Sequence, residues 1–138
     1  MGIVALGSLL HDIALIRKVG DKKEHHINGA VIAESILRKY TCDDVLIQKV
    51  TNCVLHHRSS KAARNVEELC VADADILAHF DNILMLFNSA FTRHNVELSQ
   101  VRSWMKAVFE DDFADLSDKT KEEFRPKYEL ICKIVLGE

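Results

Sequence analysis

The chain of 138 residues is long enough for a domain with its own hydrophobic core, and 48% of its residues are hydrophobic. Its formal net charge of -3 argues against an extended face for nucleic acid or an anionic membrane, but allows a small charged substrate held by local basic groups. No apolar run approaches the roughly 20 residues of a membrane span and no basic signal-peptide start is present, so we expect a cytoplasmic protein. The 4 scattered cysteines, without a Cys-x-x-Cys pair, argue against a disulfide framework and a structural zinc site.

Helical periodicity dominates the chain. In chain order, the expected helices cover residues of about 2–17, 25–40, 43–57, 66–93, 96–113 and 117–136. The third is capped by Thr41 or Asp43 and is followed by a basic loop at 58–65. The segment Ile3–Leu10 has the composition of a buried helix and not of a solvated terminus, so we expect further residues before Met1.

Strands are not expected, because no segment shows sustained alternation or the Asn-Gly and Asp-Gly turns of hairpins. The single proline, Pro126, falls inside the last helical pattern and predicts a helix start or a kink there. No repeat, low-complexity tract or linker divides the sequence. We therefore predict an all-α fold, a helical bundle that forms a single domain over residues 1–138. Its helices at about 2–93 would bear a metal site, and those at about 96–137 would supply packing.

The first candidate functional residues are the neighbours His11 and Asp12, at the end of an apolar segment. Imidazole and carboxylate groups are both ligands for divalent metals. On a continuous helix their side chains would diverge by about 100°, so both reach one ion only if the helix axis points across the site. An isolated pair of this kind is more often a surface or capping pair, but further histidines and aspartates follow.

Two more pairs of adjacent histidines are candidates. His25 and His26 begin the second expected helix and project from different faces, so they are alternatives for one ligand position. His56 and His57 end the third helix, and His57 lies on the same side as the inward-facing Cys53. Neutral imidazoles at such a helix end can bind one metal ion or two adjacent ions.

Two carboxylates interrupt the apolar pattern of the fourth helix. Asp73 and Asp75 stand between an apolar run and Ile76. A carboxylate that enters a core needs a cation or full hydrogen bonding to offset its desolvation. A buried ion pair would satisfy this requirement, but the nearby histidines favour metal ligation. We expect Asp73 to be the ligand and Asp75 to contribute less.

These residues follow one another in the order Leu9-Leu10-His11-Asp12-Ile13, His25-x-x-x-Gly29-Ala30-x-x-Ala33, His56-His57 and Cys70-Val71-Ala72-Asp73-Ala74-Asp75. In this order the chain resembles the HD-domain superfamily of metal-dependent phosphohydrolases over about its first 80 residues. The resemblance implies an all-helical domain around one or two divalent ions. It implies the ligands His11, Asp12, His25, His56, His57 and Asp73, and His25 fits the helix register better than His26.

The resemblance also implies hydrolysis of a phosphoester or phosphoanhydride in a small phosphorylated, nucleotide-like substrate. Asp12, with His11 beside it, would act in catalysis by holding the metal and orienting water. Basic residues in the loops beside the dyad and the tandem histidines would bind the substrate phosphate, namely Arg17, Lys18, Arg58 and Lys61. Mixed histidine and aspartate ligands suit Fe, Mn, Ni, Zn and Mg, so the metal is left open.

A non-catalytic module that binds a metal or a nucleotide for regulation is the alternative. The later part of the chain carries apolar residues that can pack a homodimer interface, although an internal core is the commoner use of such stripes. The residues concerned are Phe80, Leu84, Phe87, Phe91, Trp104, Met105, Val108 and Phe109.

Overall fold

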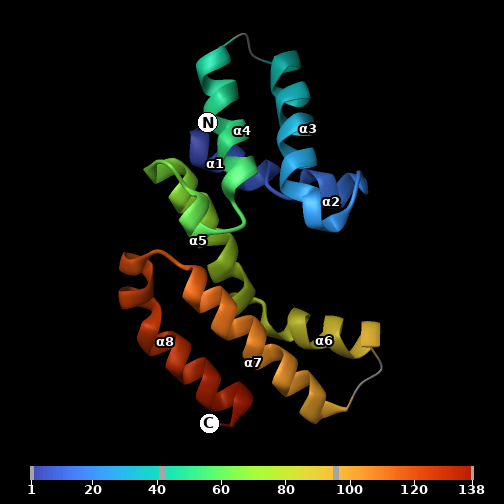
Figure 1. Ribbon diagram of the computed structural model, residues 1–138, viewed down its shortest axis with the longest axis vertical. Helices are drawn as coiled ribbons and strands as arrows, with labels where there is room; N and C mark the ends of the chain where they lie inside the picture. Colours follow the sequence, from blue (N-terminus) through green and yellow to red (C-terminus); the bar gives the residue numbers. More distant parts are fainter. Residues whose placement is uncertain (1, 41–42, 95–96, 138) are drawn as a thin grey trace. The chain divides into compact units, whose positions relative to one another are not determined.

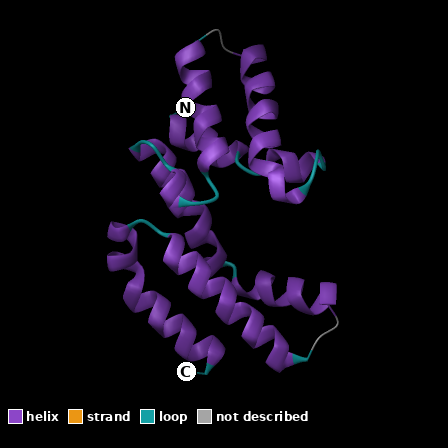
Figure 2. Cartoon of the chain, in the orientation of Figure 1, coloured by secondary structure: helices purple, strands orange, loops and turns teal. Residues whose placement is uncertain are grey.

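The computed structural model describes residues 2–40, 43–94 and 97–137, and every regular element in these ranges is a helix (Figures 1 and 2). The α-helices are α1 (Ile3–Leu10), α2 (Ile13–Arg17), α3 (His25–Tyr40), α4 (Asp44–His56), α5 (Val66–Asp81), α6 (Ile83–His94), α7 (Leu98–Asp115) and α8 (Asp118–Leu136), with short 3-10 helices η1 (Lys22–Glu24) and η2 (Ser60–Ala62). The all-α prediction is confirmed. None of the described helices is long and apolar enough to cross a membrane.

Two of the expected helices are each divided in the structure. The prediction of one helix over residues 2–17 is wrong, because the chain breaks at Asp12 (φ -101°, ψ 15°) between α1 and α2. The expected helix at 66–93 is likewise divided at Asn82, whose side-chain amide donates to the carbonyl of Ala78 over 3.0 Å and so competes with the helical backbone. At Pro126, by contrast, α8 continues through the proline. Apolar periodicity alone does not reveal the breaks at Asp12 and Asn82.

The contacts within the chain define two compact units, Met1–Asp75 and Ile76–Glu138. The boundary falls inside α5, which is earlier than residue 93, where the sequence placed the end of the metal-bearing part. The residues expected to bind a metal all belong to the first unit.

In the first unit, α4 packs against both α3 and α1, and α2 packs against α3 (Figure 1). Buried Leu37, Ile47 and Val50 form a cluster between these helices. The cap at the start of α4 is Asp43, whose carboxylate accepts from the backbone N–H groups of the second and third residues after it over 3.0 and 3.3 Å. Thr41, the alternative cap, lies outside the described residues.

A close approach at Gly7 fixes α1 against its neighbours. A Cβ atom at this position would lie 2.8 Å from Cβ of Cys53 on α4 and 3.2 Å from a methyl group of Val71 on α5. Both neighbours are buried, so they have little room to move. Gly7 therefore sets the separation of α1 from α4 and α5, and α1 leads directly into His11.

The second unit has an aromatic core. Phe80, Met105 and Phe109 are buried there, and the rings of Phe80 and Phe109 have centroids 5.1 Å apart. These three residues, which the sequence also allowed at a dimer interface, serve the internal core. Two other residues of that set are exposed, Leu84 to 84% and Trp104 to 42%.

We expect Gly7→Ala to destabilise the protein. Overpacking a rigid core costs about 1–3 kcal/mol, and the better helix propensity of alanine returns at most about 1 kcal/mol. Urea denaturation measures the difference. Gly2→Ala is the matched control, because a Cβ atom at Gly2 has nothing within 4 Å. Equal stabilities of the two variants would contradict the packing role of Gly7.

Candidate metal centre

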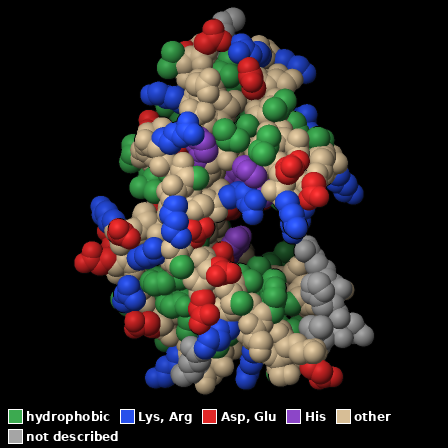
Figure 3. Space-filling model, in the orientation of Figure 1, with side chains coloured by type: hydrophobic (Ala, Val, Ile, Leu, Met, Phe, Trp, Pro, Cys, Tyr) green, Lys and Arg blue, Asp and Glu red, His purple; other side chains and the backbone are tan. Residues whose placement is uncertain are grey.

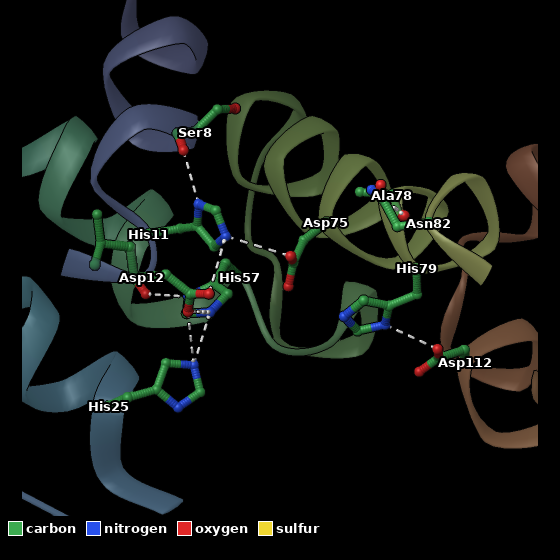
Figure 4. Close-up of polar contacts among 11 residues, drawn as sticks. Ser8, His11, Asp12, His25, His57, Asp75, Ala78, His79, Asn82 and Asp112 are labelled. Carbon is green, nitrogen blue, oxygen red and sulfur yellow. Dashed lines mark hydrogen bonds and ion pairs between the residues drawn. The ribbon is translucent and has the colours of Figure 1, made fainter. Parts of the chain in front are cut away.

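The break between α1 and α2 places His11 and Asp12 so that their side chains point to one region (Figure 4). His11 is the residue after α1, and Asp12 is the N-cap of α2. Nε2 of His11 lies 3.6 Å from Oδ2 of Asp12. The divergence of about 100° expected for neighbours on a continuous helix is thus avoided.

Three histidines each make the same kind of local hydrogen bond to the backbone. His11, His25 and His57 each place Nδ1 at the main-chain carbonyl three residues earlier, over 2.7, 2.8 and 2.7 Å. A carbonyl oxygen only accepts, so Nδ1 carries the proton in all three rings. In a neutral ring of this tautomer the Nε2 lone pair is available to a metal, and metal-binding histidines are commonly fixed in this way.

The Nε2 atoms of His25 and His57 lie 3.1 Å apart, and they lie 3.4 and 3.8 Å from Oδ1 of Asp12. Because Nδ1 of both rings donates to a backbone carbonyl, the two Nε2 lone pairs are directed at one point, which favours a cation there. Donor atoms bound to one ion at about 2.0–2.2 Å lie about 3.0–3.5 Å from each other. Two of the three distances lie in this range, and the third, from His57 to Asp12, is longer, at 3.8 Å, so the three residues form a candidate site for a divalent ion in donor type and approximate spacing.

The other oxygen of Asp12 faces a second set of donors. Oδ2 lies near Nε2 of His11, and the same Nε2 atom lies 3.3 Å from Oδ1 of Asp75 (Figure 4). The two oxygens of Asp12 thus divide the site into one set with His25 and His57 and another with His11 and Asp75.

Asp75 is the carboxylate of α5 that the structure brings to His11, whereas the sequence favoured Asp73. Asp73 lies on the same helix and is only 8% exposed. A helical register explains the contact of Asp75. Val71 lies next to Gly7, and one turn later on both helices Asp75 meets His11. This register depends on which residues of α1 and α5 face each other, which periodicity along one helix does not give.

The tandem histidines take different partners. His57 is 1% exposed and faces Asp12 and His25, while Nδ1 of His56 lies 2.9 Å from Oε2 of Glu68. Glu68 is also only 1% exposed, and its carboxylate accepts from the backbone N–H of Arg64 over 2.8 Å and from the side chain of Asn65 over 2.7 Å. The sequence pattern does not single out Glu68 as a functional residue. Its third donor, His56, is twelve residues earlier in the chain.

The basic residues expected to bind substrate are all exposed. Arg17 ends α2, Lys18 follows it in a left-handed conformation (φ 56°), and Lys61 lies in η2. Arg58 follows His57 directly and donates to the carbonyl of Lys23 over 3.0 Å. On the face shown in Figure 3, histidine side chains reach the surface beside Lys and Arg side chains.

Histidine protonation differs across the site. The hydrogen bond with Asp75 raises the pKa of His11 to about 9. Burial lowers the pKa of His57, which favours its neutral form. Burial, and then the charge of Arg58, lower the pKa of His26, whose buried Nδ1 has no hydrogen-bond partner among the described residues. Between the two alternatives at the start of α3, the structure brings His25 to Asp12.

We expect metal affinity to rise with pH. His11 is protonated below its pKa of about 9 in the ion-free protein, and it must lose this proton before Nε2 can bind an ion. Affinity for Mn²⁺ should therefore increase by about tenfold per pH unit from about pH 7 to 8.5. Isothermal titration in two buffers of different ionisation enthalpy measures both the affinity and the released proton. A pH-independent affinity without proton release would contradict a role for His11.

Glu68→Gln should unfold more easily than the unchanged protein. In the unchanged protein three donors share the buried carboxylate of Glu68. An amide at this position offers them a weaker acceptor or places its own NH₂ group against them, which costs about 1.5–3 kcal/mol of stability. Glu67→Gln is the control, because Glu67 is partly exposed and lies 4.0 Å from Lys49. Its effect should stay within about 0.5 kcal/mol in thermal melts. Equal thermal stabilities of the two variants would contradict a stabilising role for the hydrogen bonds of Glu68.

Comparison with protein families agrees with this arrangement. The sequence pattern of the HD domain matches residues 1–79, which is more than half of the chain. The chain therefore belongs to the HD domain family, whose members bind divalent metals and are commonly metal-dependent hydrolases. Comparisons with curated proteins and with solved structures gave no significant match.

Proposed function

We propose that the protein is a metal-dependent phosphohydrolase that cleaves a phosphoester or phosphoanhydride bond in a small nucleotide-like substrate. The observation that carries the proposal is the 3.1 Å separation of the His25 and His57 Nε2 atoms beside Asp12. Membership in the HD domain family supports the reaction class.

The donor sets on the two oxygens of Asp12 support binding of one or two divalent ions. Asp12, His25 and His57 would hold one ion, and Asp12 with His11 and Asp75 would hold a second. The donor types suit Fe, Mn, Ni or Zn, with Mg less well served by imidazole. When bound, such an ion supplies a water of lowered pKa and neutralises charge on phosphoryl oxygens.

The residues of the chain would have separate roles in this reaction. The carboxylate of Asp12 contacts both donor sets, so it would fix their spacing and orient water by hydrogen bonding. The Nδ1 contacts to backbone carbonyls would hold the imidazoles in place without movement during turnover. Lys18 and Lys61, both exposed, would attract substrate phosphate.

Asp12→Ala should remove both bound metal and hydrolysis, because the change deletes the anion that both donor sets share. Metal content is measured after loading with Mn²⁺, and turnover is measured on phosphomonoesters, nucleotides and dinucleoside polyphosphates. Asp44→Ala is the control, since Asp44 is an exposed acid at the start of α4 that pairs with Arg38. Both metal content and turnover should survive in this control.

Asp75→Asn and Asp73→Asn extend the test to α5. If Asp75 is the ligand, its variant should lose more metal than the Asp73 variant. Bound metal without turnover on any of these substrates would reject the phosphohydrolase and favour the regulatory binding module. If the unchanged protein binds no metal, both the phosphohydrolase and a regulatory module that binds a metal are rejected.

A further inference from the structure

Arg58 links the two segments that carry the facing histidines. It follows His57 at the end of α4, and its Nη1 atom donates to the carbonyl of Lys23 in η1 over 3.0 Å. The two residues are 35 positions apart in the sequence. His25 begins the helix that follows η1. The contact thus joins the residue directly after His57 to the residue two positions before His25.

The short η1 helix is held at several points. The carboxylate of Asp21 accepts from the backbone N–H of Lys23 over 2.8 Å. The carbonyl of Lys22 is the partner of Nδ1 of His25, and the next carbonyl, that of Lys23, is the partner of Arg58. Neighbouring carbonyls of one turn therefore bind the metal-site histidine and the arginine. A displacement of this turn would move the Nδ1 anchor of His25.

We propose that Arg58 is a positioning residue, which holds η1 so that His25 faces His57 and thereby raises the affinity of the site for a divalent ion. This inference rests on the proposed metal site and replaces the substrate-binding role expected from the sequence. A substrate phosphate would be contacted by other basic residues of the surrounding loops.

The physical need for such a contact comes from the facing imidazoles. Because the Nε2 lone pairs of the two rings face each other, contacts from outside the pair are needed to keep the rings in place until a cation binds between them. A restraint already present before binding lowers the cost of ordering the ligands. Because Arg58 is exposed, its hydrogen bond competes with water and its contribution is modest.

The experiment compares binding of Mn²⁺ alone, with no substrate, in Arg58→Met, Arg58→Lys and Arg38→Met. Arg38→Met is the matched control, because Arg38 also joins α3 to α4, through Asp44, but at the opposite end of the helix pair from His25 and His57. Affinity is measured by competition with a chelator. Co²⁺ absorption in the visible range reports the ligand geometry, and thermal melts report folding.

We expect Arg58→Met to weaken Mn²⁺ binding by about three- to tenfold, with an altered Co²⁺ spectrum. Arg58→Lys, which retains a donor of similar reach, should recover part of the affinity. Arg38→Met should bind Mn²⁺ as the unchanged protein does. If Arg58→Met does not fold, Arg58→Lys decides the test. We expect this variant to bind Mn²⁺ about two- to threefold more weakly than the unchanged protein does.

Mn²⁺ binding and Co²⁺ spectra that are unchanged in every folded Arg58 variant would overturn the proposal. An increased KM for a phosphoester with unchanged metal affinity would return Arg58 to substrate binding. Equal weakening by Arg38→Met would also overturn it, because the effect would then come from general loosening of the helix pair. If the unchanged protein binds no Mn²⁺, the proposed function fails first, and that result is distinct from each of these.

Discussion

The facing Nε2 atoms of His25 and His57 impose the constraint on which the rest of the site depends. Their Nδ1 atoms donate to backbone carbonyls, so both Nε2 lone pairs face one point, at which a metal ion would be favoured. The carboxylate of Asp12 lies beside this position and supplies the compensating negative charge. A buried cluster of imidazoles without such an anion would lose much of its affinity for a cation.

Helix ends explain why the backbone carbonyls are available. The last carbonyls of a helix have no partner within it, and Ser8 and Val54 lie in the last turns of α1 and α4. His11 and His57 follow these helices and satisfy those carbonyls through Nδ1. The same geometry turns Nε2 away from the helix. The partial negative charge at each helix C-terminus also favours a cation at the site.

The sequence predicted those parts of the structure that depend on local pattern. The start and end of α3 and the cap at Asp43 follow from periodicity and helix-capping chemistry, and the grouping of Asp12, His25 and His57 follows from the family motif. The break at Asp12 was missed, because an apolar run carries no sign of a change in helix direction. Asp75 was ranked below Asp73, and Glu68 was not singled out, for another reason. Their roles arise from partners on other helices, His11 and His56, whose register is fixed by contacts such as that of Gly7 with Cys53.

The two donor sets around Asp12 resemble each other. Asp75 raises the pKa of His11 to about 9, so a proton is held between His11 and Asp75 at neutral pH. In the other set, the Nε2 atoms of His25 and His57 face one point beside Asp12. Both sets share Asp12, and each therefore has a position for positive charge beside one of its oxygens. A divalent ion bound beside His11 would take the place of its proton, so the same carboxylates would compensate either charge.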